Sequence, residues 1–225
     1  MTRGDIRFGG TSTCWSLTAW PVDNGTATYG GGRPNKITVL PGGTLTATAQ
    51  TSNFTYAASL NVRKDATLRF ASTGTGTGFT ADAGACNHVV DGLLDIAIPY
   101  FAACDQTFWG SGRVNVASTL AVDGHLSRTI LAGGVKLVPS AWNTATAGAA
   151  DGVIAITVED DATLGATADW TYGVASGVTA TSAAADRALR IAKRATLTID
   201  TDDADGAGTS HALTFTDPIL GATGN

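Results

Sequence analysis

Two short segments of the chain could place a pair of carboxylates together. V-D-G-L-L begins at Val90 and V-D-G-H-L begins at Val122, so Asp91 and Asp123 hold the same place in a shared frame, 32 residues apart. If adjacent coils of a parallel stack carried the two frames, the carboxylates would lie ~5 Å apart, as in a retaining glycosidase. An Asp before a Gly is also a common turn former. Our main interpretation therefore assigns no catalytic residue, and the Asp pair is the alternative.

The three histidines suggest no further chemistry. His88, His125 and His211 lack the spacing of zinc ligands, and no G-x-S-x-G or Cys/His signature accompanies them. Nucleophilic catalysis and a zinc centre are therefore not expected.

An acidic run, Asp200–Gly206, raises the question of calcium, with Asp202, Asp203 and Asp205 as candidate ligands. An EF-hand alignment on the final D-G of this run lacks the ligands at both ends of the loop. A solvated acidic turn is the simpler interpretation. We expect no cofactor, and a calcium loop of another type stays open as the alternative.

Aromatic residues are concentrated between Pro99 and Gly112. This segment holds Tyr100, Phe101, Phe108 and Trp109, with hydrogen-bonding side chains between them. It departs from the repeat pattern described below, so we expect an inserted loop outside the core. Flat rings with polar neighbours suit the faces of sugars, and loops on a rigid scaffold often carry binding sites. The four rings are our glycan-binding candidates; the alternative is that they close loops over the fold.

The cysteines are Cys14, Cys86 and Cys104. An odd count is not a disulfide framework. Cys86 and Cys104 flank a segment of one coil's length, so a bridge between them is one candidate and would indicate an oxidising compartment. The alternative is three small apolar side chains.

The elements that would position these residues follow a repeated plan. Apolar residues two apart, a corner, and a resumed alternation predict a strand, a tight corner and a second strand. Four segments share the plan: Ile37–Ala47, Leu60–Phe70, Ile156–Ala166 and Leu189–Ile199. Turn-forming or charged residues occupy the corners, at Pro41-Gly42, Lys64-Asp65, Asp160-Asp161 and Lys193-Arg194.

The spacing of the repeats predicts a β-solenoid. The shared Thr recurs at Thr44, Thr67, Thr163 and Thr196, with intervals of 23 and 33 residues. Such units bury their apolar face only by stacking. We expect an all-β parallel solenoid of about eight or nine coils with loop inserts, at ~25 residues per coil. The frame also predicts that four leucines point inward at equivalent positions: Leu45, Leu68, Leu164 and Leu197.

Composition agrees with this class and excludes others. Charged residues make up 15% of the chain and glycine is abundant, which is typical of β-rich folds with many turns. A net charge of -5 argues against nucleic acid and against anionic membrane surfaces as partners. No apolar run is long enough for a membrane-spanning helix, and the first residues lack the apolar core of a signal peptide.

The recurring T-L corners (G-G-T-L-T, D-A-T-L-R-F, D-A-T-L-G, R-A-T-L-T-I), V-D-G-H-L and the opening F-G-G-T-S-T-C-W carry a family resemblance. They resemble the right-handed parallel β-helix of bacterial autotransporter passengers and autotransporter-associated repeats. The resemblance implies a secreted or surface-displayed shaft. Pectinases share this fold, but their Gly-His-Gly motif is incomplete here because Gly124-His125 lacks the second Gly.

We therefore expect residues 1–225 to form one elongated solenoid domain, with irregular entry coils in 1–35 and ends left open, as in a fragment of a longer chain. The expected function is a non-enzymatic extracellular or cell-surface module, a bacterial adhesin-like shaft with glycan-binding loops. The alternatives are a polysaccharide-degrading lyase or glycoside hydrolase, and a segment of a phage tail fibre or tailspike. Expected partners are glycans or a host surface, and the rest of a longer chain or another chain at the open ends.

Overall fold

The computed structural model describes residues 5–14, 36–48, 52–55, 59–71, 79–83, 86–102, 105–120, 126–142, 153–173, 183–202 and 209–221. Within these ranges the regular secondary structure is β-strand, as the sequence predicts, apart from one short helix, α1 (Ala184–Arg187). None of the helical structure in these ranges is long and apolar enough to cross a membrane.

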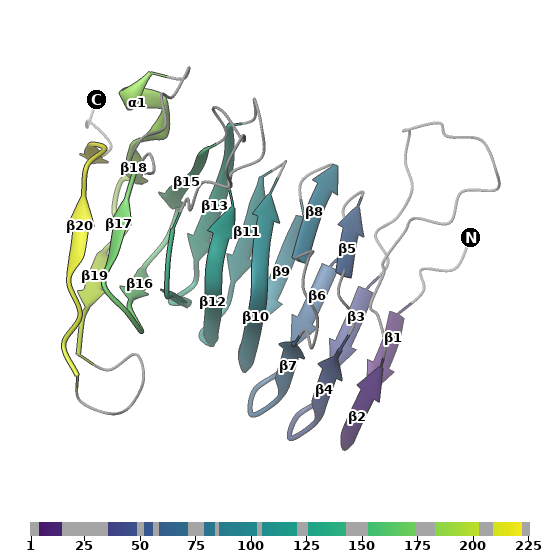
Figure 1. Cartoon of the computed structure of the whole chain (residues 1–225). Coiled ribbons are helices and arrows are strands. Elements are labelled where there is room, and N and C mark those ends of the chain that lie inside the picture. Colours follow the sequence, from purple (N-terminus) through teal and green to yellow (C-terminus); the bar gives the residue numbers. More distant parts are fainter. Residues whose placement is uncertain are drawn as a thin grey trace.

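Most strands belong to two long parallel sheets (Figure 1). Sheet A contains, in spatial order, β1 (Asp5–Phe8), β3 (Lys36–Val39), β6 (Ser59–Val62), β9 (Cys86–Val90), β11 (Gln106–Trp109), β13 (Leu126–Ala132), β15 (Val153–Val158), β18 (Leu189–Ile191) and β21 (Ile219–Gly221).

Sheet B faces it and runs from β2 (Thr11–Cys14) through β4 (Thr44–Ala47), β7 (Thr67–Phe70), β10 (Leu93–Ala102), β12 (Arg113–Leu120), β14 (Lys136–Pro139) and β16 (Ala162–Gly165) to β19 (Leu197–Asp200). Two further strands extend it beside β10, namely β5 (Ser52–Thr55) and β8 (Phe79–Ala83).

Successive strands alternate between the two sheets, apart from β5 and β8 and from β17 and β20, which form a third sheet. Each strand therefore pairs with the strand one circuit earlier, as when Thr44 lies opposite Thr67 and Leu93 opposite Arg113. The hydrogen-bond ladder continues through the corners, since Thr67 N donates to Gly43 O at 2.9 Å and Arg113 N donates to Gly92 O at 2.8 Å. The 23-residue interval from Thr44 to Thr67 thus corresponds to one circuit, as predicted.

Turn chemistry explains where the chain leaves sheet A. In Leu40–Gly43, Gly43 N donates to Leu40 O at 2.9 Å, and Pro41 precedes Gly42, whose φ is +70°. Pro at the second position and a positive φ at the third define a type II turn. The corners at Lys64-Asp65 and Lys193-Arg194 place a non-glycine residue in the left-handed region, with φ of 60° at Asp65 and 75° at Arg194. All three lie at corners that the sequence predicted.

The next corners are too tight for side chains. A Cβ at Gly112 would collide with the Gly92 carbonyl oxygen, and a Cβ at Gly92 would collide with the carbonyl oxygens of Arg63 and Ala66. Glycine is required here because backbones of successive circuits meet directly.

The inward leucines form the centre of the core. Leu45, Leu68 and Leu164 have no exposed surface, and Leu45, Leu68 and Leu94 lie side by side on adjacent strands. Burying each such side chain contributes ~1.5–3 kcal/mol. The prediction for these leucines is confirmed, while Leu197 in β19, at the end of sheet B, is only partly buried against the same cluster.

The predicted alignment of the last repeat is wrong by two residues. The 33-residue interval would place Thr163 opposite Thr196, but Thr163 lies opposite Thr198 and Ala162 opposite Leu197. Thr196 stays in the corner because its N–H donates to Asp161 Oδ1 at 2.8 Å and its carbonyl accepts from Ala162 N at 3.0 Å. An Asp that caps the corner therefore lengthens it and shifts the strand that follows.

A third, two-stranded sheet, β17 (Trp170–Tyr172) with β20 (Leu213–Phe215), lies near the C-terminal end of the stack (Figure 1). It completes an aromatic cluster in which ring centroids lie 6.1 Å apart for Trp142 and Trp170, and 5.9 Å apart for Tyr172 and Phe215. Trp142, Trp170 and Tyr172 are all buried. These buried rings extend the hydrophobic core at this end of the stack.

Hydrogen bonds and an ion pair fix the position of this aromatic cluster. The Tyr172 hydroxyl accepts from Ile156 N and donates to Arg187 O, both at 2.9 Å, and burial raises its pKa. Arg187 donates twice to Asp217, at 2.9 and 3.0 Å, with both side chains nearly buried. A two-point ion pair of this kind has a fixed geometry.

Candidate functional site

The described residues between Pro99 and Gly112, 99–102 and 105–112, belong to strands and a corner of the repeat rather than to an inserted loop. Tyr100 lies within β10, Phe108 lies within β11, and both side chains are buried at 1% and 0% exposure. The period of two continues through β11, so Gln106 and Phe108 point inward while Thr107 and Trp109 point outward. Tyr100 and Phe108 are therefore core residues, and their prediction as surface rings was wrong.

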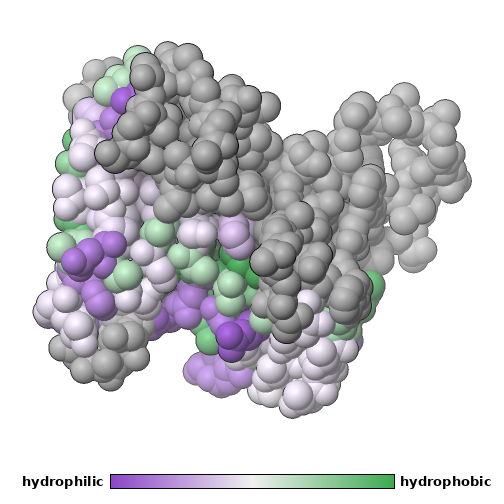
Figure 2. Space-filling view, viewed as in Figure 1, coloured by the Kyte–Doolittle hydropathy of each residue, from purple (hydrophilic) through white to green (hydrophobic). Residues whose placement is uncertain are grey.

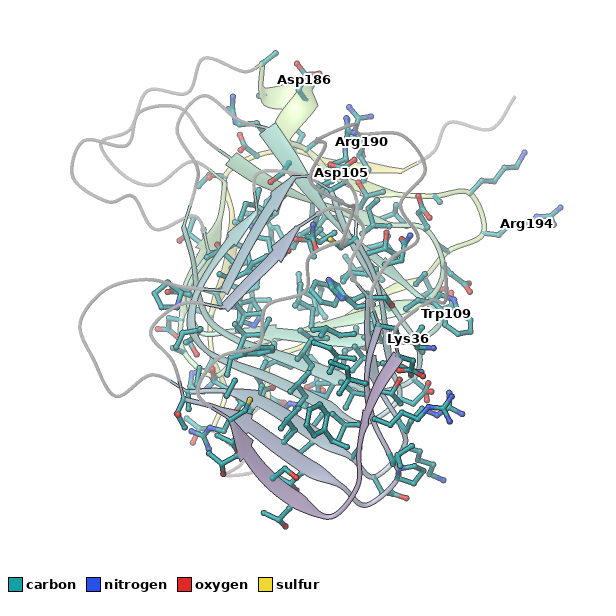
Figure 3. The ribbon with its side chains drawn as sticks, turned by 90° about the vertical axis from the view of Figure 1, so that its right-hand side faces the viewer. Lys36, Asp105, Trp109, Asp186, Arg190 and Arg194 are labelled. Atoms are coloured by element: carbon teal, nitrogen blue, oxygen red, sulfur yellow. The ribbon has the colours of Figure 1, made fainter. Side chains whose placement is uncertain are left out.

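Trp109 is the candidate that stays at the surface. Its side chain is 53% exposed, and in Figure 3 it projects from the ribbon on the same side as Lys36, away from the side chains that fill the interior. Phe101, the fourth candidate, has its side chain outside the described part of the chain. Of the three candidate rings whose side chains are described, Trp109 alone is exposed.

The indole ring of Trp109 packs against the backbone of the next circuit, at Gly133. A Cβ built at Gly133 would lie 3.0 Å from Trp109 Nε1 and 3.2 Å from Cε2, so the ring edge rests against a residue with no side chain. Gly133 has a φ of +74°, which other residues rarely adopt. The corner after β13 therefore leaves room for the ring.

Two rows of side chains surround Trp109 on the outer face of sheet A. By strand pairing, Val89, Trp109 and Ala132 lie side by side, and Asn87, Thr107 and Ile130 form the parallel row two residues earlier. Asn87 is exposed and Thr107 half-buried. We call these six residues the Trp109 face. Its members combine an apolar row with two hydrogen-bonding side chains and contain no ionisable group.

Charged groups border this face. On one side Arg128 and Asp105 form an ion pair, with Nη1 and Oδ2 3.6 Å apart, and Asp105 Oδ1 also accepts from Arg128 N at 2.9 Å. On the other side Asp91 Oδ1 would lie 2.9 Å from a Cβ at Gly110, the residue after Trp109. The Asp91 carboxylate therefore lies beside the residue that follows Trp109, and the pairing of Leu131 with Val158 places Glu159 beyond Ala132 at the far end of the same row.

The proposed pairing of Asp91 with Asp123 stays a prediction, because Asp123 lies outside the described residues. Along the chain Asp91 follows β9, whereas Asp123 falls between β12 and β13. In the next circuit the described corner equivalent to Asp91-Gly92 is Gly110–Gly112.

A buried histidine lies beneath the Trp109 face. His88 has no exposed surface; its Nδ1 accepts from Leu60 N at 3.2 Å, so its Nε2–H donates to Gln106 Oε1 at 3.0 Å. Its ring stacks on Phe108 with centroids 5.1 Å apart. Burial lowers the pKa of His88 from 6.5 to about 4, with the hydrogen bond to Gln106 opposing. A neutral, doubly hydrogen-bonded imidazole of this kind positions strands β6, β9 and β11.

The other predicted sites are tested only in part. Cys86 is buried, while Cys104 lies outside the described residues, so the bridge stays a prediction. Asp202 Oδ1 accepts from Thr201 and Ser210 hydroxyls at 3.1 and 2.6 Å, and Asp203 and Asp205 are not described. Among the described residues no group of three His, Cys, Asp or Glu side chains could hold a metal ion.

The outer face of sheet B offers a contrast. In Figure 1 β10 and β12 lie in front, and Figure 2 shows hydrophilic residues gathered in the lower part of this side. Its charges pair internally, Arg69 with Asp95 at 3.3 Å and Lys136 with Asp200 at 2.7 Å. Ionic contacts of this kind are consistent with a solvated structural face.

Sequence reasoning missed most of the Trp109 face. Asn87, Val89, Ala132 and Gly133 come from neighbouring circuits, and only strand pairing brings them beside Trp109. The sequence signal that could have identified it is the strict alternation of Q-T-F-W, which predicts an outward Trp109 once Phe108 points inward.

Comparisons with known proteins find no matching protein family, curated protein or solved structure.

Proposed function

We propose that this chain is a non-enzymatic β-solenoid module that binds carbohydrate through Trp109. In this proposal sheets A and B are two sides of a right-handed parallel β-helix of eight or nine coils, related in kind to autotransporter passengers and working outside the cell or at its surface. The alternation of strands between the two sheets supports the solenoid, because that path returns the chain to the neighbouring rung at every circuit.

The observation that carries the binding proposal is the exposure of Trp109 on a rigid strand. A large ring that is 53% exposed, beside Val89, Asn87 and Thr107, contributes apolar surface with hydrogen-bonding groups at its edge. Sugars present the complementary pattern, a flat C–H face bordered by hydroxyls, and aromatic rings stack on such faces. Strand β11 is paired on both sides, which limits the ordering cost of binding.

The test is retention of wild-type protein on immobilised polysaccharides. We expect Trp109→Ala to abolish retention and Trp109→Phe to keep a part of it, because Phe preserves a stacking surface. Circular dichroism and thermal melting of both variants should match wild type. Equal retention of Trp109→Ala and wild type would remove Trp109 as the binding residue.

A further inference from the structure

The charge distribution around Trp109 points to the class of sugar. We infer that the Trp109 face binds an uncharged, extended glycan that crosses the strands of sheet A, and that Asp91 selects against acidic glycans. The inference rests on the proposed carbohydrate-binding function of the same face.

The two rows set the direction of the chain. The apolar row (Val89, Trp109, Ala132) and the row that starts with Asn87 and Thr107 both run perpendicular to the strands. They are separated by two residues, ~7 Å along a strand, and each row spans three strands spaced ~4.8 Å apart. A flat chain of two or three sugar rings laid across the strands therefore places its C–H faces on the apolar row and a hydroxyl edge on Asn87 and Thr107.

The shape of the face favours extended linkages. Trp109, Val89 and Ala132 lie on adjacent paired strands of one sheet, and the indole rests on the corner at Gly133. A ribbon-like, equatorially linked glycan can contact Val89 and Trp109 on two adjacent strands at once, whereas a coiled α-linked chain touches such a surface at fewer points; Ala132 on the third strand is 7% exposed and adds little contact area.

Charge explains the selection. The six residues of the face are uncharged, and the ionic pair at one border, Arg128 with Asp105, is internally compensated. At the other border the Asp91 carboxylate lies against Gly110, directly after Trp109, and its Oδ1 is 3.5 Å from Ser111 N. A uronate on the Trp109 ring would bring a second carboxylate beside this one, and like charges repel across a short distance. A neutral sugar hydroxyl can instead donate a hydrogen bond to Asp91.

The experiment compares three hexasaccharides by calorimetry: cellohexaose, which is neutral and extended, maltohexaose, which is neutral and coiled, and hexagalacturonate, which is acidic. We expect wild type to bind cellohexaose at least ten-fold more tightly than either of the others. Raising the salt concentration should reduce the difference in affinity between cellohexaose and hexagalacturonate, because ions screen the repulsion. It should leave the difference in affinity between cellohexaose and maltohexaose unchanged.

Variants separate the contributions. Asp91→Asn keeps size and turn preference but removes the charge, so it should bring hexagalacturonate to within about three-fold of cellohexaose. Asn87→Ala should weaken cellohexaose binding about two- to ten-fold, the usual effect of one hydrogen bond. Thr46→Ala, an outward threonine of sheet B, is the matched control and should change nothing.

The outcomes distinguish the two levels of the proposal. Equal or tighter binding of hexagalacturonate that Trp109→Ala still abolishes would overturn the selection for neutral glycans and leave the carbohydrate site standing. So would an Asp91→Asn variant with unchanged discrimination. Binding that Trp109→Ala does not affect, or no binding of any of the three, would overturn the carbohydrate site itself.

Discussion

Trp109 and Trp170 lie in two regions that the repeat frame leaves unassigned, and they have opposite environments. Trp109 is 53% exposed on the outer face of sheet A, whereas Trp170 is 4% exposed. Trp170 belongs to β17, which pairs with β20, and its ring lies against Trp142 and Phe215 at 6.1 and 6.4 Å. The comparison shows that the type of residue does not decide its environment. Trp170 is buried in a strand that pairs with β20, whereas Trp109, among the described residues, stays exposed on the outer face of sheet A.

The polar groups beneath the two regions differ in the same way. The middle of the stack holds a neutral imidazole, His88, with hydrogen bonds to Leu60 and Gln106. The C-terminal region holds an ion pair, Arg187 with Asp217. Acid and mutation should therefore destabilise the two regions through different groups.

The largest expected effect is on the aromatic cluster. Trp170→Ala should lower the free energy of unfolding by about 3–5 kcal/mol, because it leaves a cavity among packed rings. Urea denaturation followed by circular dichroism measures the change. A loss below about 1 kcal/mol would mean that β17 and β20 do not seal the core, and the comparison with Trp109 would lose its basis.

Breaking the ion pair should come next. Asp217→Asn leaves the nearly buried Arg187 without its counter-charge, so it should lower the free energy of unfolding by about 3 kcal/mol. The double variant Arg187→Met with Asp217→Leu is the control, since replacing both partners by apolar groups should recover most of the loss. A double variant as unstable as the single one would show that packing, rather than charge, holds this region.

Acid should act on the middle of the stack. The folded-state pKa of His88 is about 4, below its ordinary 6.5, so the unfolded state binds a proton between these values and the folded state does not. Stability should therefore fall as pH drops from 6.5 to 4, by up to about 3 kcal/mol. Denaturation at several pH values measures how the free energy of unfolding depends on pH. His88→Gln should remove this dependence between pH 6.5 and 4, whereas His211→Gln should retain it. An unchanged dependence in His88→Gln would show that other groups cause it.

The smallest stability effect belongs to Trp109. Trp109→Ala should change the free energy of unfolding by less than about 0.5 kcal/mol, as is usual for exposed positions. The same denaturation experiment measures it beside Trp170→Ala. A loss comparable to that of Trp170→Ala would make Trp109 a structural residue and erase the difference between the two regions.

Local chemistry in the sequence determined the repeating architecture. Alternating apolar residues placed Leu45, Leu68 and Leu164 in the core, and Pro-Gly or charged dipeptides located the corners at Gly42, Asp65 and Arg194. These features depend on a strand's period of two and on backbone angles at single residues, so neighbours along the chain suffice to predict them.

Tertiary structure decided what depends on residues from different circuits. The two-residue shift at Thr196 follows from its bond to Asp161, the burial of Trp170 follows from β20, and the Trp109 face requires Asn87, Val89 and Gly133 from the strands and corner beside it. None of these contacts has a signature in the local pattern, because each joins segments some 20 to 43 residues apart whose meeting is set by the length of the connection between them. The alternation in the sequence determines that Trp109 points outward, whereas the pairing of β11 with β9 and β13 determines which residues lie beside it.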